Sequence, residues 1–311
     1  MSRALFIGDL NVDVMMGGME SLPVVDREVA CQSYDVVMGA STVLCACAYA
    51  SLGGEAAFAG LAGRDDYGDF MLRGLADFGI DTSLVRRTDK VRTGVTVNLI
   101  YRSTRTQVTY PGTIAEFSGE GLEEAVLAGF RHIHFGGVYL QHNFRHRIAG
   151  LLEAAGRLGI SSSLDPQWDA SERWEYMDQW LPRLTWLFLN DDEARSLTGA
   201  RTSEEAVLAL AGRTRCPLVK TGERGALVCG HGTVQRVPAR RVEVVDTTGA
   251  GDSFDAGFLY ATLVRGMPAA EAAAFANAVA GRSCTFVGGV NARSSFSDIQ
   301  RFIETNPVRE A

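Results

Sequence analysis

The chain has 311 residues, of which 46% are hydrophobic, and this is enough to bury a substantial core in one large α/β domain or two smaller ones. We favour one domain with an appendage. A formal net charge of −7 lacks the basic excess of a nucleic-acid-binding protein, and no apolar run approaches the length of a membrane span. The six cysteines contain no Cys-x-x-Cys pair, and the first residues lack a signal-peptide core, so we predict a cytoplasmic protein with buried thiols.

The first predicted element is a buried strand at residues 4–7, which ends at Gly8 and Asp9. Polar groups at the ends of parallel strands are where α/β proteins bind ligands. A helix of small residues is predicted at about 41–52. Residues 95–101 and 107–110 largely alternate apolar and polar side chains, which is typical of half-exposed antiparallel strands. We expect them to form a small sheet outside the core.

From residue 122 onward the pattern alternates between strand and helix, as in parallel doubly wound sheets. The predicted strands are residues 132–135, 160–164, 186–189, 217–220, 226–229 and 234–237. The predicted helices are residues 145–158, 204–212, 251–264 and 269–283. The sequence therefore predicts an α/β fold with a mostly parallel central sheet.

Residues 246–257 carry the strongest chemical signal, because three small residues and an acid stand at the first turn of a predicted helix. Gly249, Ala250 and Gly251 leave the turn free of bulk, so the unpaired amides of the helix start can hold a phosphoryl group. Asp252 then projects a carboxylate into the same space, where it can take a proton from an attacking hydroxyl. The alternative interpretation is an ordinary cap, with oxygens supplied by Asp246 and its neighbours.

These residues closely resemble the C-terminal signature of the ribokinase-like (PfkB) family of small-molecule kinases, and the resemblance extends from Gly8 to the Gly288-Gly289 region. It implies a single domain over residues 1–311, folded as a three-layer α/β/α sandwich with a small protruding β-lid. The lid is expected to come from segments at about 14–37 and 92–115. Such lids frequently form dimer contacts in relatives, so a homodimer through the lid is also expected.

The acceptor side of the predicted site lies near the N-terminus. Residues 8–13 resemble the family's first strand and substrate loop, which implies that Asp13, with Asn11, holds the hydroxyls of a polyol. Residues 38–53 resemble the family's glycine-rich signature, so Gly39 is also assigned to the acceptor. In this segment Leu44 replaces the usual asparagine, which removes a polar group normally directed at the substrate.

The nucleotide side is predicted from three later motifs. Asn190 and Glu193 resemble the Asn-x-x-Glu motif, which implies phosphate binding by Asn190 and water-mediated Mg²⁺ binding by Glu193, although the same pair can simply cap a helix. Lys220 can contact phosphates or can be an ordinary lysine at a strand end. The resemblance also assigns ATP to Gly222, Gly225 and Asn277, and a monovalent cation such as K⁺ to Asp246 and Thr248.

The sequence thus predicts an ATP- and Mg²⁺-dependent sugar kinase with Asp252 as general base and Gly249 to Gly251 as the anion hole. Two alternatives remain open. A nucleoside kinase is allowed by Leu44 and by aromatic residues near the lid or pocket, namely Tyr101, Tyr110 and Trp168. A non-catalytic sugar sensor is less favoured, because neither the base nor the anion hole is lost. Acid-sugar acceptors are disfavoured because Asp169 would repel a carboxylate, unless Arg102 or Arg105 compensates.

Overall fold

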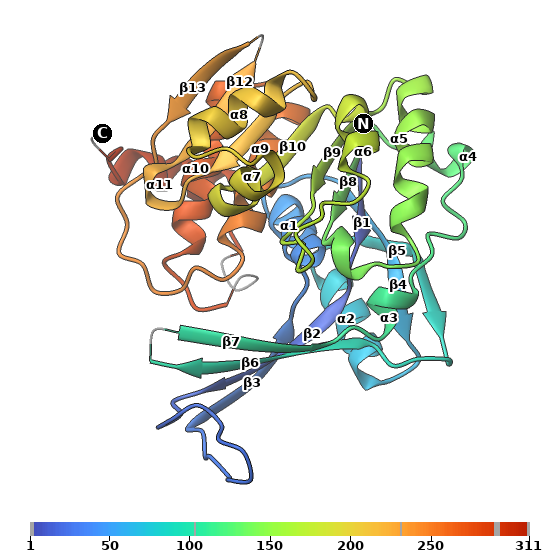
Figure 1. The fold of residues 1–311 in the computed structure, drawn as a ribbon, viewed down its shortest axis with the longest axis vertical. Helices are drawn as coiled ribbons and strands as arrows, with labels where there is room; N and C mark the ends of the chain where they lie inside the picture. The colour runs from blue at the N-terminus through green and yellow to red at the C-terminus, as the bar shows by residue number, and fades with distance from the viewer. Residues whose placement is uncertain (1–2, 103, 231, 289–292, 310–311) are drawn as a thin grey trace.

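The computed structural model describes residues 3–102, 104–230, 232–288 and 293–309, so Gly289 lies outside the described residues. Its larger sheet has nine strands in the order β13-β12-β11-β10-β9-β8-β1-β4-β5 (Figure 1). The strands are β1 (Ala4–Gly8), β4 (Ala56–Gly63), β5 (Asp81–Thr88), β8 (His132–Gly136), β9 (Ser161–Asp165), β10 (Trp186–Asn190), β11 (Pro217–Lys220), β12 (Ala226–Gly230) and β13 (Thr233–Val237).

The predicted mostly parallel sheet is confirmed. The seven neighbouring strands from β11 to β5 pair in parallel, and only the β11–β12 and β12–β13 pairs are antiparallel. The seven strands predicted for this sheet are present, each within one residue of its predicted ends. The carboxyl ends of β9, β10 and β11 therefore lie side by side, which brings Asp165, Asn190 and Lys220 to one edge.

Helices cover both faces of the sheet, as the predicted three-layer sandwich requires. Alternate residues of β1 face opposite layers: Phe6 packs among the residues of one hydrophobic cluster, while Leu5 and Ile7 pack in the other. The first layer contains α1 (Ser41–Ser51), α2 (Asp66–Asp77), α9 (Ala250–Leu263), α10 (Ala269–Ser283) and α11 (Phe296–Thr305). The second contains α4 (Glu124–Leu127), α5 (Ile148–Arg157), α6 (Met177–Trp180), α7 (Asp191–Thr198) and α8 (Ser203–Ala211).

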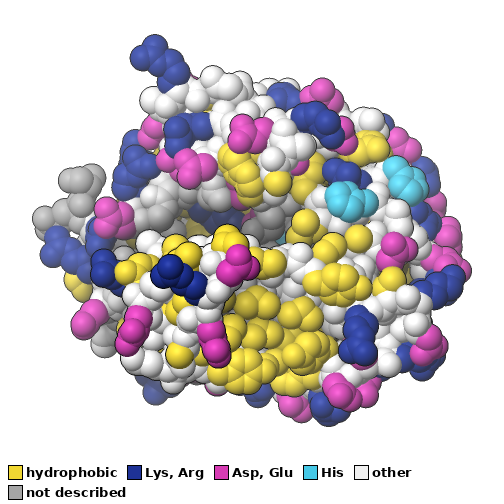
Figure 2. Space-filling model, turned by 60° about the horizontal axis from the view of Figure 1, so that its bottom comes forward, with side chains coloured by type: hydrophobic (Ala, Val, Ile, Leu, Met, Phe, Trp, Pro, Cys, Tyr) yellow, Lys and Arg dark blue, Asp and Glu magenta, His cyan; other side chains and the backbone are white. Residues whose placement is uncertain are grey.

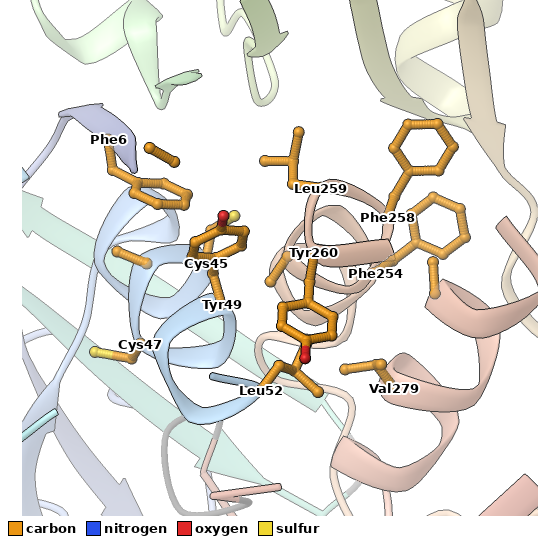
Figure 3. Close-up of a cluster of buried hydrophobic side chains, with 14 of the residues drawn as sticks. Phe6, Cys45, Cys47, Tyr49, Leu52, Phe254, Phe258, Leu259, Tyr260 and Val279 are labelled. Atoms are coloured by element: carbon orange, nitrogen blue, oxygen red, sulfur yellow. The ribbon is translucent and has the colours of Figure 1, made fainter. Parts of the chain in front are cut away.

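Helix α9 is buried between the sheet, α1 and α10, and Figure 3 shows Tyr260 on the side of α9 toward Tyr49 of α1, with Phe254 and Phe258 on the opposite side of the helix. A Cβ at Gly257 would lie 3.0 Å from the Cα of Ala276, so the missing side chain allows α10 to approach closely. Because α9 is enclosed along most of its length, its first turn is held in a fixed position relative to the strand ends.

A second sheet of four strands, in the order β3-β2-β6-β7, projects from the main body (Figure 1). It consists of β2 (Asn11–Gly17), β3 (Ser33–Met38), β6 (Gly94–Tyr101) and β7 (Thr104–Tyr110). Asp9 and Leu10 are the only residues between β1 and β2, so the two sheets are joined by a very short connection.

The two faces of this second sheet differ in character. Asp13, Thr96 and Thr109 are neighbours in register on one face. The next row on the other face consists of valines from all four strands: Val36, Val14, Val97 and Val108. Tyr34, Val108 and Tyr110 are more than half exposed. Figure 2 shows hydrophobic side chains gathered in a patch on the side of the molecule where this sheet lies.

Several elements differ from the predictions. Strands β2, β4 and β5 and helix α11 were not predicted, and α5 begins at Ile148 rather than at 145, because residues Arg145–Arg147 form a 3₁₀ turn. Strand β4 is made of Ala, Gly, Phe and Leu and is buried on both faces, so it has no alternation that a pattern search would detect. Within the described ranges, no helix is both long and apolar enough to span a bilayer.

Candidate active site

The first turn of α9 forms the floor of a cleft with a volume of about 520 Å³. Gly249 precedes the helix in the left-handed conformation, with φ of 73°, which favours glycine. Ala250 donates to the carbonyl of Thr247 at 3.1 Å. Among the described residues, no acceptor is found for the amides of Gly249 or Gly251, and both residues line the cleft. These two amides are therefore available to an anion.

Asp252 lies in the same turn and also lines the cleft, although only 8% of the residue is exposed. Burial raises the pKa of Asp252 to about 7, and the hydrogen bond from Ser41 and the charge of Lys220 partly oppose this effect. The hydroxyl of Ser41 donates to Oδ1 of Asp252. A carboxyl with a pKa near neutrality is well suited to accept a proton from a substrate hydroxyl.

Lys220 lies directly beside this turn, at the end of β11. A Cβ at Gly251 would lie 3.3 Å from Nζ of Lys220. Nζ donates to Oδ2 of Asp165 at 2.7 Å and to Oδ1 of Asp255 at 3.2 Å. Asp165 and Asp255 are both about 99% buried. The lysine is thus part of a buried ion cluster and also borders the cleft, so its ion pairs do not exclude the predicted contact with phosphates.

The acceptor residues predicted near the N-terminus meet on the inner face of the second sheet. Nδ2 of Asn11 donates to Oδ1 of Asp13 at 2.9 Å, and both residues line the cleft. Burial raises the pKa of Asp13 to about 6. Gly39 does not line the cleft. A Cβ at Gly39 would lie 2.2 Å from Oδ1 of Asp13, so this glycine makes room for the carboxylate.

Arg105 connects the second sheet to the helix start. Its Nη1 donates to Oγ1 of Thr248 at 3.0 Å, across the cleft that both residues line. Among the described residues, no carboxylate lies within ion-pair distance of its guanidinium, although its charge lowers the pKa values of Asp13 and Asp246. Sequence reasoning considered Arg105 only as a partner for an acidic substrate and missed this contact.

A second cavity, of about 330 Å³, lies on the other side of the α9 turn. Its walls include Val242, Val244 and Phe254, and such an apolar lining suits a flat heteroaromatic group. The two cavities share five lining residues, which are Lys220, Gly222, Thr247, Ala250 and Gly251. Ligands in the two cavities would therefore meet at the anion-binding turn.

The predicted nucleotide residues Gly222, Gly225 and Asn277 line the second cavity. Gly222 has φ of 60° and open space where a Cβ would stand. A Cβ at Gly225 would instead lie 2.1 Å from the carbonyl oxygen of Val237, so this glycine permits close approach of the chain's own backbone. Nδ2 of Asn277 donates to the same carbonyl at 2.9 Å. Gly225 and Asn277 thus shape the cavity by fixing its wall.

Asn190 and Glu193 form a reciprocal capping box at the start of α7. Oδ1 of Asn190 accepts from the amide of Glu193, and Oε2 of Glu193 accepts from the amide of Asn190, each at 2.8 Å. The capping interpretation is therefore correct. It does not exclude the predicted binding of phosphate and Mg²⁺, because both residues also line the cleft. Burial, followed by the charge of Asp165, raises the pKa of Glu193 to about 7.

Asp246 stabilises the loop before α9. Its Oδ1 accepts from the amide and hydroxyl of Thr248 at 2.9 and 2.8 Å, and its Oδ2 accepts from the amide of Gly288 at 2.9 Å. Asp246 lines neither cavity, whereas Thr248 lines the cleft. The two residues predicted for a monovalent cation are therefore adjacent, with the carboxylate already occupied by hydrogen bonds within the loop.

One expectation about the acceptor pocket needs correction. Asp169 does not line the cleft, because its carboxylate accepts from Ser171 and from the amide of Trp174 and closes a local turn. The predicted repulsion of an acidic substrate by Asp169 therefore has no structural basis. Of the three aromatic residues predicted near the lid or pocket, Trp168 lines the cleft, whereas Tyr101 and Tyr110 end β6 and β7 of the second sheet. The register places Tyr110 on the apolar face of the second sheet.

Other residues of the site were not assigned from the sequence. Gln167 reaches Ser41 through a hydrogen bond of 2.8 Å, and Asp9 accepts from the backbone amide of Thr42 at 3.2 Å. The available signals were weak: Asp9 and Asp165 each follow a predicted strand, and Asp255 stands one helical turn after Asp252. For Ser41, the one feature that could have suggested a role at the site was its position at the start of the predicted small-residue helix.

Comparison with known proteins agrees with this geometry. Residues 4–294 match the family described as pfkB family carbohydrate kinase. A fructokinase of Klebsiella pneumoniae is 29% identical over 267 residues, which cover 81% of this chain and 87% of the relative. An aminoimidazole riboside kinase of Salmonella typhimurium is 28% identical and covers 100% of this chain and 98% of the relative. A putative ribokinase II of E. coli, solved with ATP and Mg²⁺, has a TM-score of 0.87 at 21% identity, with 98% and 99% of the two chains covered.

We predict that Lys220→Met destabilises the protein by about 3–5 kcal/mol at pH 8, because Asp165 and Asp255 would lose their buried counter-charge. The loss should shrink as the pH falls, since the two carboxylates can then take up protons. Urea unfolding monitored by circular dichroism measures the effect. The matched control is Lys90→Met at the chain's other lysine, which is exposed and should change stability by less than about 0.5 kcal/mol. Equal stabilities of the two variants would contradict the prediction.

Proposed function

The chain belongs to the pfkB family of carbohydrate kinases, and on that premise we propose that it transfers the γ-phosphoryl group of ATP to a primary hydroxyl of a sugar, with Asp252 as general base. The observation that carries this proposal is the position of Asp252. It lies beside the free amides of Gly249 and Gly251, where the polar cleft and the apolar cavity meet. A base and an anion site at the junction of two ligand cavities suit in-line transfer between two substrates.

In the proposed reaction, the hydroxyl oxygen of the acceptor attacks the γ-phosphorus, and Asp252 removes the proton of that hydroxyl at the same time. The amides of Gly249 and Gly251, together with the positive end of the α9 dipole, stabilise the negative charge on the transferring phosphoryl group. Lys220 adds positive charge close to the same turn. Asn11 and Asp13 hold other hydroxyls of the acceptor, and their mutual hydrogen bond fixes the spacing of the two polar groups.

ATP is assigned to the second cavity and its phosphates to the shared turn. The apolar walls suit adenine, and Gly222 offers open backbone toward the cavity. Glu193 and Asn190 are the cleft residues that would hold the water shell of Mg²⁺, which would neutralise charge on the phosphates of ATP. For K⁺ the candidates remain Asp246 and Thr248, where added ion would have to compete with the loop's own hydrogen bonds.

A nucleoside acceptor is the second candidate function. Leu140 and Trp168 line the cleft while remaining 45% and 44% exposed, and Leu44 adds apolar surface where relatives carry a polar residue. The flat heteroaromatic ring of a nucleoside would cover these side chains, whereas a free sugar would leave them in water. A sugar sensor without catalysis is disfavoured, because the base and the anion-binding turn are both intact.

The second sheet is proposed to act as a lid over the cleft and as a dimer contact. Its inner face carries Asp13, Thr96 and Thr109 toward the cleft, and its outer face carries the valine row with exposed Tyr34 and Tyr110. The loop between β2 and β3 adds Val25, which is 84% exposed. An apolar face of this kind is stabilised when a second copy covers it.

We predict that Asp252→Asn abolishes most turnover, with kcat lower by about 10²–10⁴-fold, because an amide cannot accept the proton. ADP release should be measured with ATP and Mg²⁺ across fructose, ribose, ribose phosphates, sugar acids and nucleosides. Binding of ATP, measured by calorimetry, should be retained. Turnover near the parent rate would eliminate Asp252 as base, activity on nucleosides alone would select the second candidate, and ligand binding without any turnover in the parent protein would favour the sensor.

We predict that Arg105→Gln lowers kcat/KM by about 10–100-fold, because the lid loses its charged contact with the phosphate-binding loop. Steady-state kinetics with the best acceptor from the panel provides the measurement. Arg102→Gln is the control, because Arg102 is a lid arginine whose guanidinium packs over the ring of Tyr101, 4.9 Å from its centre, and does not line the cleft. Similar kinetics for the two variants would show that Arg105 has no role at the site.

We predict that the protein is dimeric at micromolar concentration and that Val108→Lys weakens the dimer at least about tenfold, because a charge would be buried in the apolar contact. Sedimentation equilibrium measures the association constant. Leu208→Lys on α8 provides a control of similar exposure away from the lid and should leave association unchanged. A monomeric parent protein, or equal dissociation of both variants, would refute the lid contact.

A further inference from the structure

The carboxylate of Asp252 is held by a side chain that none of the sequence motifs assigns. Ser41 is the first residue of α1, and its hydroxyl donates to Oδ1 of Asp252. Nε2 of Gln167, in the segment after β9, donates to Oγ of Ser41 at 2.8 Å. The three groups come from distant parts of the chain, and all three residues line the cleft.

The direction of these hydrogen bonds follows from the chemistry of the groups. An ionised carboxylate can only accept, so the single proton of the Ser41 hydroxyl points to Asp252. The hydroxyl oxygen must then accept from its other neighbour, which is the amide nitrogen of Gln167. This order makes Gln167 the residue that orients the hydroxyl and Ser41 the residue that contacts the base.

Gln167 is itself fixed at both ends. Its backbone amide donates to Oδ1 of Asp165 at 3.0 Å, and its side chain reaches Ser41. Its φ of 59° lies in the left-handed region, which is unfavourable for a residue with a long side chain. Such a conformation persists where surrounding contacts hold it, and it is frequent at functional sites. Asp165 in turn binds Lys220, so the chain of contacts runs from the buried ion cluster to the base.

We propose that Ser41 and Gln167 are positioning residues for the phosphoryl-transfer base, in which Gln167 orients the Ser41 hydroxyl and Ser41 holds Oδ1 of Asp252, so that Oδ2 receives the proton. This inference rests on the proposed function, in which Asp252 is the base. The acceptor O–H bond breaks, its proton passes to Oδ2 and its electron pair forms the new bond to the γ-phosphorus. The bond from that phosphorus to the bridging oxygen breaks at the same time, and ADP leaves with the electron pair.

The surroundings of Asp252 explain why this hydrogen bond matters. Most titratable groups that face it are acidic and come from the β1–β2 connection, β9, α7 and α9, with one lysine from β11 and one thiol from α1. They are Asp9, Asp165, Glu193, Asp255, Lys220 and Cys45. Burial is the largest cause that raises the pKa of Asp252, and Asp165 and Asp9 raise it further. The Ser41 hydroxyl and Lys220 act in the opposite direction. Without the hydroxyl, the charged form of Asp252 loses the side-chain hydrogen bond that stabilises it and keeps only the more distant charge of Lys220.

The test compares Ser41→Ala, Ser41→Thr and Gln167→Met with the parent protein. The carboxyl carbon of Asp252 is titrated by ¹³C NMR, with its resonance assigned by its absence in Asp252→Asn. In Ser41→Ala we expect the titration midpoint to rise by about one pH unit, because the carboxylate loses a hydrogen-bond donor. Gln167→Met should cause a smaller rise, and Ser41→Thr, which keeps a hydroxyl, should restore the parent value.

The same variants are then assayed for kcat as a function of pH, with ATP, Mg²⁺ and the best acceptor from the panel. In Ser41→Ala the loss of activity should be greatest at pH 6 and should diminish toward pH 9, because the base is then ionised in both proteins. A merely structural role would lower kcat by the same factor at every pH and leave the midpoint unchanged, and that result would overturn the proposal. The NMR titration needs no acceptor, so it tests the contact between Ser41 and Asp252 even if Asp252→Asn retains activity and the proposed function fails.

Discussion

The site depends on one compensating charge, the ammonium group of Lys220. The proposed phosphoryl transfer would require positive potential at the start of α9, yet the proposed base in the same turn is a carboxylate, and Asp165 and Asp255 are buried beside it. Uncompensated carboxylates in such a place would destabilise the fold and repel phosphate. The order of β9, β10 and β11 places the lysine within reach of both acids. The topology of the sheet thus makes an acidic active site compatible with an anionic substrate.

The two cavities differ in polarity, as a polar acceptor in one and the adenine of ATP in the other would require. The cleft is lined by polar groups from the second sheet and by the strand ends, whereas the other cavity has valine, alanine and phenylalanine walls behind α9. Their shared residues are confined to the end of β11 and the loop and first turn of α9. Because α9 is packed on several sides, the first turn of α9 within this shared part is firmly positioned. In the part of the chain that the structure describes, the second sheet contributes one side-chain hydrogen bond to the loop before α9, from Arg105 to Thr248.

The large sheet was predictable where strands had the usual signals, because residues 186–189 and 217–219 are short apolar runs followed by Asn190 and Lys220. Strand β4 escaped prediction because both of its faces are buried and its small side chains favour no particular structure. The motif at the start of α9 pointed to Asp252 and to the amides of Gly249 and Gly251. It could not identify Ser41, Gln167 or Arg105, because their roles arise from contacts between residues more than a hundred positions apart. Gly39 and Gly225 were predicted beside ligands, but both are explained by the space they leave for the chain's own atoms.

In the second sheet, side chains alternate strictly between the inner and the outer face, and this alternation links the polar lining of the cleft to the apolar outer surface. In β2, Asp13 belongs to the polar inner row and Val14 to the apolar outer row, and their partners on β6 are Thr96 and Val97. A slip of one residue between these strands would turn the carboxylate of Asp13 outward and place a valine in the cleft. Substitutions that alter either face can accumulate independently, but an insertion or deletion inside β2 or β6 would exchange the faces of the strand beyond it. Lids of this kind are therefore expected to diverge by side-chain identity and by loop length, while the number of residues within these two strands stays constant.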